Sequence, residues 1–336
     1  MNALEAINLS KTYNDTDGFF LKNKKNIRAV NDISFTLKEN QTLGIVGESG
    51  CGKSTLARML VGLLEPSSGT INLQNKNIQQ YQRQELGQVI QYVFQDPLSS
   101  LNPRKTIYQS LAAPLNYLHQ HDNSLIKEKM LSVMGEVGLK EEFLDRYPHE
   151  FSGGQAQRIG IARALLADAR ILILDEPVSA LDVSIQSQVL NLLNDLKRKF
   201  KLSFIVISHD LAVVENISDE IAVMYFGDIV EHNSSKEIFQ SPHHPYTELL
   251  VGSVPKLNKQ FADIQTKHTE LPDPANPPLG CSFYSRCSYR ADNCKNNKTP
   301  INSDMKLPFV SCFNPCLLYT SPSPRDLSTS RMPSSA

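Results

Sequence analysis

The sequence predicts an α/β protein built around a mostly parallel sheet. Two short apolar runs, Ile171–Leu174 and Leu202–Ile207, flank a helical stretch at Ile185–Phe200. A third run, Leu43–Val46, is followed by a glycine-rich turn and by an amphipathic helix from Thr55. Continuous apolar strands that alternate with helices are typical of a parallel sheet whose two faces are both covered.

The remaining segments differ in their hydrophobic pattern. The first third of the chain predicts strands and turns, and the polar residues 14–26 are expected to form an exposed loop. Leucines at helical spacing predict a helix that ends before Pro66, and helical spacing returns over residues 96–166 with few strand signals. The expected strands are Leu4–Leu9, Ile33–Leu37, Thr42–Val46 and Thr70–Leu73; the first helix carries Leu56, Leu60, Leu63 and Leu64, and later helices are Leu125–Val137 and Gln155–Leu166.

The composition argues against several classes of protein. Lys and Arg number 34 and Asp and Glu 35, so the net charge of −1 disfavours a chain that mainly coats nucleic acid or an anionic membrane. Hydrophobic residues make up 40%, enough for a packed core. No apolar run reaches the roughly 18 residues of a membrane-spanning helix, and Met1–Ser10 lacks the pattern of a signal peptide. We therefore expect a cytosolic chain.

One glycine-rich stretch predicts a phosphate site. It matches the pattern Gly-x-x-x-x-Gly-Lys-[Ser/Thr] between an apolar strand and an amphipathic helix, the context that supports this motif. Backbone N–H groups there can point at phosphates, Lys53 can reach the β- and γ-phosphates, and Ser54 can ligate Mg²⁺. The alternative is a glycine-rich turn before a core helix. The residues expected to bind nucleotide are Gly47, Glu48, Ser49, Gly50, Cys51, Gly52, Lys53, Ser54 and Thr55.

Two carboxylates follow the apolar run Ile171–Leu174. Asp175 is expected to hold Mg²⁺ and Glu176 to polarise the attacking water, if the strand ends near the phosphate loop. Taken alone, an apolar strand that ends in Asp-Glu is common and mostly indicates a strand entering a loop. The phosphate motif upstream favours the catalytic interpretation.

The chain resembles the ATP-binding-cassette ATPases over about residues 1–250. Phe151-Ser-Gly-Gly-Gln155 resembles their signature, which usually begins with Leu, and Gln95 in Tyr92-Val-Phe-Gln-Asp resembles the Q-loop glutamine. The other matching positions are Asp182 in a D-loop-like Ser-Ala-Leu-Asp, His209 as the switch histidine and Tyr13 as the aromatic residue that stacks on adenine.

The resemblance implies a fold and a set of roles. The expected fold is a P-loop NTPase core with an antiparallel β subdomain and a helical subdomain over about residues 96–166. Glu176, His209 and Gln95 are the implied catalytic residues, and Ser54, Gln95 and Asp175 the implied ligands of Mg²⁺, with ATP as the nucleotide. In the family the signature completes the site of a partner chain in a head-to-tail dimer; the residues implied to do so are Ser152, Gly153, Gly154 and Gln155. Asp182, in the D-loop-like segment, is also implied to bind nucleotide.

Two further segments resemble one branch of that family. Pro97-Leu-Ser-Ser-Leu-Asn-Pro-Arg104 and Pro242-His-His-Pro-Tyr-Thr247 are similar to segments of the ATPase subunits of dipeptide and oligopeptide importers, nearer the F-type than the D-type. The resemblance implies a second ATPase subunit, two permeases and an extracytoplasmic peptide-binding protein as partners, no nucleic acid, and a peripheral position at the cytoplasmic face of the cell membrane.

Three functions other than peptide import are possible for a chain with this cassette. Nickel or other small-solute importers share the subfamily. A DNA-acting ATPase with the same cassette is disfavoured, because about 100 residues separate Ser54 from Ser152 without sustained heptads. A non-hydrolysing binding module is disfavoured by Glu176 and His209.

The six cysteines are unevenly placed, with five in the last 56 residues. Residues 251–315 are expected to form a small extension whose Cys281, Cys287, Cys294 and Cys312 could hold a [4Fe–4S] cluster or zinc, or remain unliganded thiols. The spacing lacks a Cys-x-x-Cys pair. Residues 316–336, which begin at Cys316, resemble translated sequencing-adapter read-through and are expected to be a non-native, disordered tail.

Overall fold

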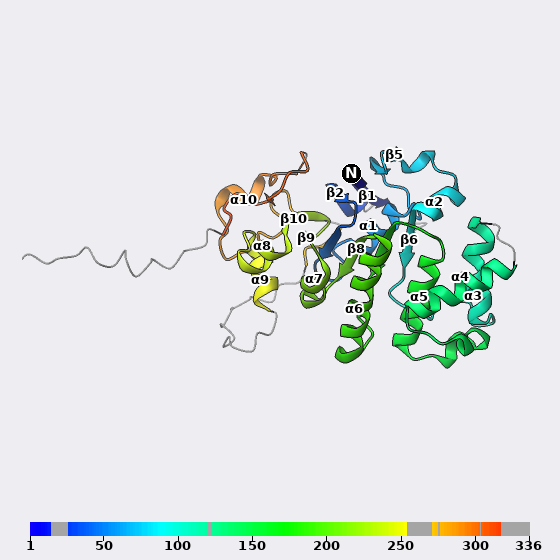
Figure 1. The fold of residues 1–336 in the computed structure, drawn as a ribbon. Helices are drawn as coiled ribbons and strands as arrows, with labels where there is room; N and C mark the ends of the chain where they lie inside the picture. Colours follow the sequence, from blue (N-terminus) through cyan, green and yellow to red (C-terminus); the bar gives the residue numbers. More distant parts are fainter. Residues whose placement is uncertain (15–25, 120–122, 254–270, 275, 303, 317–336) are drawn as a thin grey trace, which may run out of the picture.

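The computed structural model describes residues 1–14, 26–119, 123–253, 271–274, 276–302 and 304–316. It confirms the predicted α/β class: strands form two sheets in the middle of the molecule and helices flank them (Figure 1). Most of the predicted N-terminal loop and of the predicted C-terminal tail lies outside the described residues. No helix in the part described is long and apolar enough to cross a membrane.

The central sheet has seven strands in the order β11-β10-β9-β3-β8-β7-β6. Strands β6, β7, β8, β3 and β9 run parallel, and β10 and β11 continue the sheet antiparallel. Every residue of β3, β7 and β8 is buried, which explains their continuous apolar runs. The strands are β3 (Thr42–Val46), β6 (Ile90–Val93), β7 (Ile171–Asp175), β8 (Ser203–Ser208), β9 (Glu220–Tyr225), β10 (Asp228–Ser234) and β11 (Phe309–Val310).

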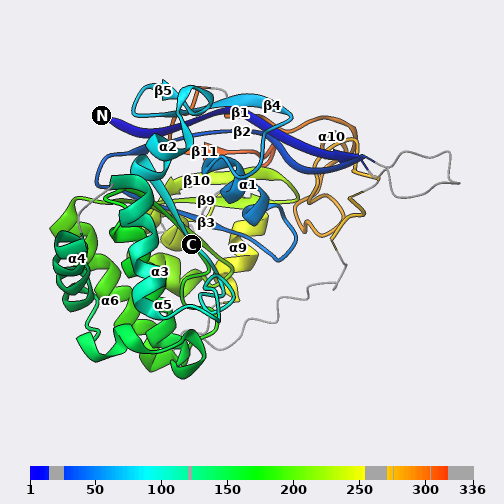
Figure 2. The ribbon, with the colours of Figure 1, turned by 90° about the vertical axis from the view of Figure 1, so that its right-hand side faces the viewer.

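A second, antiparallel sheet lies over the first, in the order β2-β1-β4-β5. Its strands are β1 (Asn2–Asn14), β2 (Asn26–Lys38), β4 (Ser68–Leu73) and β5 (Lys76–Asn77). Helix α1 (Lys53–Leu60) packs between the two sheets, and its buried leucines share one apolar core with both (Figure 2). The predicted extension of this helix to Leu64 is wrong, because the chain leaves the helix before Gly62, whose φ is 72°.

The helices fall into three groups. One group lies between β6 and β7 in sequence, at one end of the molecule (Figure 1), and its apolar core continues onto β7, β8, α6 and α7. That group contains α3 (Ile107–Pro114), the π-helical turn η2 (Leu115–His119), α4 (Asn123–Glu136), η3 (Glu141–Asp145), η4 (Pro148–Glu150) and α5 (Gly153–Leu165). The others are η1 (Ile78–Gln80) and α2 (Arg83–Val89) before β6, and α6 (Val183–Phe200), α7 (Leu211–Ile217), α8 (Ser235–Gln240), α9 (Pro245–Gly252) and α10 (Asp292–Asn296) after β7.

The C-terminal extension closes onto the edge of the central sheet. Strand β11 pairs with β10 through Glu231–Val310 and His232–Phe309, and Phe283 enters a core formed by β9, β10 and α7 to α9. Tyr225 and Tyr246 are fully buried beside Phe283. The extension therefore belongs to the same packed body as the sheet.

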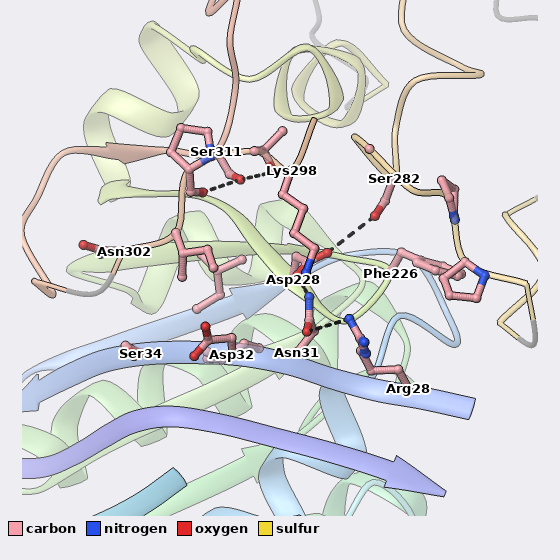
Figure 3. A pocket seen from close by; sticks show the side chains of 18 of the residues that line it. Arg28, Asn31, Asp32, Ser34, Phe226, Asp228, Ser282, Lys298, Asn302 and Ser311 are labelled. Carbon is pink, nitrogen blue, oxygen red and sulfur yellow. Dashed lines mark hydrogen bonds between the residues drawn. The ribbon is translucent and has the colours of Figure 1, made fainter. Parts of the chain in front are cut away.

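A cavity of about 160 Å³ separates the extension from β2 and from the turn between β9 and β10 (Figure 3). Asp228 faces this cavity and accepts hydrogen bonds from Asn31 Nδ2 at 2.6 Å and from Ser282 Oγ at 3.5 Å (Figure 3). Asp228 thus joins a strand of the antiparallel sheet to the extension. Burial raises the pKa of this carboxyl from its ordinary value to about 6.

We expect the substitution D228N to increase the stability of the folded protein in a pH-dependent way. Because the pKa in the folded state lies above that in the unfolded state, wild-type stability falls as pH rises from about 4 to 6 and stays reduced above 6. Asparagine can still accept the bond from Asn31 with its Oδ1 and can donate its amide N–H to Ser282 Oγ, without the charge. We expect thermal denaturation to show D228N melting about 2–4 °C above wild type at pH 7, with the difference vanishing near pH 4. The exposed control D145N should show no such pH dependence; equal melting of D228N and wild type at pH 7 would contradict the assignment.

Candidate nucleotide site

The phosphate loop connects the end of β3 to the start of α1 and is enclosed by backbone on two sides. A Cβ on Gly47 would lie 2.1 Å from the carbonyl oxygen of Met224, and one on Gly52 would lie 2.0 Å from that of Ala29. Gly52 also has φ 105°, a conformation that side chains disfavour. The glycines of the motif are therefore required by close packing against β9 and β2.

Lys53 holds the loop from inside. Its buried ammonium donates hydrogen bonds to the carbonyl oxygens of Gly47 at 2.7 Å and Glu48 at 2.9 Å. The first turn of α1 follows at once, so its free N–H groups and the positive end of its dipole face the same loop. This is the arrangement that binds phosphate groups in proteins.

The carboxyl ends of four parallel strands meet at this edge of the sheet. Gln95 follows β6, Glu176 follows β7 and His209 follows β8. Gln95 Nε2 donates to Glu176 Oε2 at 3.0 Å, and His209 Nδ1 lies 2.9 Å from Glu176 Oε1. Glu176 therefore contacts both of the other residues predicted to be catalytic, which are 114 positions apart in the sequence.

Glu176 occupies a constrained backbone position. Its φ is 47°, in the left-handed region, and its N–H donates to the carbonyl oxygen of Ile207 at 2.8 Å. A non-glycine residue in this region carries strain that the surrounding structure must hold. Its side chain is largely buried, whereas that of His209 is half exposed.

Asp175 and Ser54 provide the oxygens expected of a magnesium site. Burial raises the pKa of the Asp175 carboxyl, and Ser54 lies close enough to oppose part of this shift. Asp175 Oδ2 accepts a hydrogen bond from Tyr92, while Asp175 Oδ1 is buried without a partner in the described part of the chain. A buried carboxylate oxygen left unpaired beside a hydroxyl fits a hydrated Mg²⁺, which needs few protein ligands when phosphates supply the rest.

Comparison with known proteins agrees with this geometry. Residues 30–179 match the family model described as ABC transporter, and residues 230–294 match the one described as oligopeptide/dipeptide transporter, C-terminal region. The chain is 48% identical to the oligopeptide transport ATP-binding protein OppF of Haemophilus influenzae, over 90% of this chain and 93% of that protein. It is 46% identical to the dipeptide transport ATP-binding protein DppF of Escherichia coli, over 92% and 93%.

The chain belongs to the ABC transporter ATPase family. Solved structures support the same fold. The protein cbiO1 from Clostridium perfringens, described as part of the ABC transporter complex cbiONQ, matches with a TM-score of 0.61 and 30% identity over 71% of this chain and 91% of that one. The ATP-binding cassette MJ0796, solved as a dimer with ADP and Pi, matches with a TM-score of 0.61 and 26% identity over 69% and 98%.

The residues predicted to form the signature, Ser152–Gln155, lie at the start of α5. Ser152 caps α5: its Oγ accepts from the N–H of Gln155 at 3.4 Å, and Gln155 Oε1 accepts from the N–H of Ser152 at 3.1 Å. A Cβ on Gly153 or Gly154 would press on Leu181 or Ile185 of the neighbouring D-loop and α6. Within the described residues, no hydrogen bond joins the signature to Gly47–Thr55.

Asp182 and Tyr13 lie at the border of the site. Asp182 is exposed at the start of α6, next to Val183, which is 79% exposed. Tyr13, 41% exposed, pairs across the sheet with Ile27, two residues before Ala29, whose carbonyl touches the phosphate loop. Ser49 and Gly50 are exposed at the tip of the loop, whereas Cys51 is buried beneath it, as expected for a residue that fills space.

The four cysteines of the extension line one small cavity of about 10 Å³ together with Phe283. In the described part of the chain, no group of three or more histidine, cysteine or acidic side chains is placed to hold a metal ion. The four thiols therefore share one cavity but are not placed as ligands of the expected cluster or zinc. Cys316, the first residue of the predicted tail, donates its N–H to the carbonyl oxygen of His243 at 2.7 Å.

Sequence reasoning missed three residues that contact the site. Tyr92 bonds Asp175 from the strand before the Q-loop, and Arg286 and Tyr246 both bond Glu48 of the phosphate loop from the C-terminal region. The only signal in the sequence was that all three lie inside segments that resemble family motifs, Arg286 directly before Cys287 of the cysteine module. Nothing in those segments predicted the contact between Arg286 and Glu48.

Replacement of Tyr92 tests the geometry around Asp175. The substitution Y92F removes the hydrogen bond to Asp175 Oδ2, and Oδ1 already has no partner among the described residues. The carboxylate is then less well oriented toward Mg²⁺. Because a hydrogen bond to a charged group contributes about 1.5–3 kcal/mol, we expect the Mg²⁺ concentration for half-maximal ATPase activity to rise about tenfold. The control Y117F, on an exposed tyrosine of the helical subdomain, should leave it unchanged. An unaltered magnesium dependence in Y92F would show that this hydrogen bond is dispensable.

Proposed function

We propose that this chain binds and hydrolyses ATP at the edge of its parallel sheet and thereby powers the import of dipeptides or oligopeptides. The observation that carries the proposal is the contact of Gln95, Glu176 and His209 beside the phosphate loop. The names of the relatives support the substrate class, since they are described as oligopeptide and dipeptide transport ATP-binding proteins.

The phosphate loop, Gly47–Thr55, is proposed to hold the nucleotide. Lys53 is preorganised at the centre of the loop and can transfer its hydrogen bonds from the two carbonyl oxygens to phosphate oxygens. Ser54, Asp175 and Gln95 are the proposed ligands of Mg²⁺, directly or through water. The bound cation would neutralise charge that develops on the phosphates. Tyr13 is the proposed contact for the adenine ring.

Glu176 is the proposed base for the attacking water. Its two oxygens face different partners, Gln95 on one side and His209 on the other, so the carboxylate is fixed in orientation. A carboxylate so held can accept a hydrogen bond from water in line with the γ-phosphate. Gln95 and His209 are proposed to shift when the γ-phosphate binds, and thereby to move the ends of β6 and β8, which they follow.

A second ATPase subunit is the proposed partner at the exposed signature. Ser152–Gln155 form a capped helix start with free N–H groups, and Asp182 sits beside the exposed Val183 on the neighbouring helix. These features suit a head-to-tail dimer in which each signature completes the other subunit's site. Two permeases, a peptide-binding protein and a peripheral place at the cytoplasmic membrane face complete the proposed assembly.

The cysteine group remains a candidate for a [4Fe–4S] cluster or zinc. Its support is that four thiols surround one cavity, although they are not placed as ligands in this structure. Visible absorption and metal analysis after anaerobic purification test it. Protein that is colourless and free of iron and zinc would remove the site.

The decisive experiment reconstitutes the chain with a second ATPase subunit, two permeases and a peptide-binding protein in vesicles. We expect peptide-loaded binding protein to stimulate ATP hydrolysis and peptide uptake together. E176Q should still bind ATP but lose turnover by about 10²-fold or more, because the base is absent. If nickel, and not peptide, stimulated ATP hydrolysis and was taken up, the substrate would be nickel and the peptide assignment would be wrong. Normal ATP turnover in E176Q would overturn the role of Glu176.

A further inference from the structure

A salt bridge joins the C-terminal extension to the phosphate loop. Arg286 Nη1 and Nη2 donate to the two carboxylate oxygens of Glu48 at 2.9 and 2.8 Å. Both side chains are mostly buried, with 14% of Arg286 and 29% of Glu48 exposed. Such a two-pronged contact fixes direction as well as distance, and it is stronger than a neutral hydrogen bond.

The guanidinium of Arg286 is itself held in place. It lies over the rings of Tyr225 and Phe283, at 5.7 and 5.6 Å from the ring centres. Those two rings contact each other edge to face at 5.3 Å and belong to the core that attaches the extension to the sheet. The packed rings of Tyr225 and Phe283 therefore hold the guanidinium of Arg286 next to Glu48 and restrict its movement.

A second contact fixes the backbone of the same loop residue. The N–H of Glu48 donates to the hydroxyl oxygen of Tyr246 at 2.9 Å, and the Tyr246 ring packs on Tyr225 at 4.6 Å. Tyr246 is placed by the start of α9, where the side chain of His244 accepts the N–H of Tyr246 at 3.1 Å. Burial lowers the pKa of His244 to about 3, so its imidazole is neutral and can accept this bond.

Glu48 is the point through which these contacts reach the nucleotide site. Its carbonyl oxygen accepts from Lys53 Nζ at 2.9 Å and from the N–H of Cys51 at 3.3 Å. Its carboxylate is a negative charge on the loop that must receive negative phosphates. Arg286 both neutralises that charge and holds the residue that Lys53 contacts.

We propose that the C-terminal extension positions the phosphate loop for ATP, with Arg286 as a positioning residue that acts through Glu48. Without Arg286, the carboxylate of Glu48 is left unpaired beside the phosphate site, and ATP binds less tightly. The groups that carry out hydrolysis on β6, β7 and β8 do not contact Arg286, so the chemical step changes little. The inference rests on the proposed ATPase function.

The test is a double-substitution cycle measured by steady-state ATPase kinetics. We expect R286A to raise the KM for ATP about tenfold with kcat changed by less than about twofold, because the interaction acts on binding. R286K keeps the charge but not the forked contact, so its KM should lie between those of wild type and R286A. Combining R286A with E48Q removes the unpaired charge and should recover most of the affinity lost in R286A.

Controls separate this effect from loss of folding or of function. R290A removes an exposed arginine of the same extension, over Tyr284, and should leave the KM unchanged. If R286A is destabilised, R286K and the E48Q/R286K pair provide the same comparison in folded protein. An active R286A with wild-type KM, or equal KM values for R286A and the E48Q double variant, would overturn the proposal. A wild-type protein without ATPase activity would instead overturn the proposed function.

Discussion

The parallel alignment of β3, β8, β7 and β6 is the constraint on which the nucleotide site depends. Parallel strands bring their carboxyl ends to one edge of a sheet, so the residues that follow each strand become neighbours. This places Lys53, Glu176, His209 and Gln95 together although their positions in the sequence are far apart. The apolar interiors of these strands fix the register, and therefore the relative heights of the polar groups at their ends.

The phosphate loop is also shaped by parts of the chain outside that sheet core. The backbone of β2 and of β9 closes on Gly52 and Gly47, and the extension contacts Glu48 through Arg286 and Tyr246. The antiparallel sheet, the central sheet and the extension thus all meet at one loop. Because Arg286 directly precedes Cys287, one short segment of chain both contacts the phosphate loop and lines the cysteine cavity.

The sequence was sufficient for the features that depend on local pattern. The apolar runs at β3, β7 and β8 and the motif at Gly47–Thr55 were found because burial and phosphate binding each demand specific residues at fixed spacing. The end of α1 was misplaced because leucines continue the helical period beyond Gly62. Arg286 could not be found, since its partner lies 238 positions away and only the folded extension brings them together.

Hydrogen exchange of E176Q, with and without MgATP, tests most directly whether the strand ends form one nucleotide site. We expect added protection that is concentrated in four separate segments, residues 47–55, 92–95, 175–176 and 208–209, because each contributes to the same bound molecule. Residues 281–287 should gain protection with them, through Arg286 and Glu48. Protection confined to residues 47–55 would contradict the convergence of the strand ends on a single ATP.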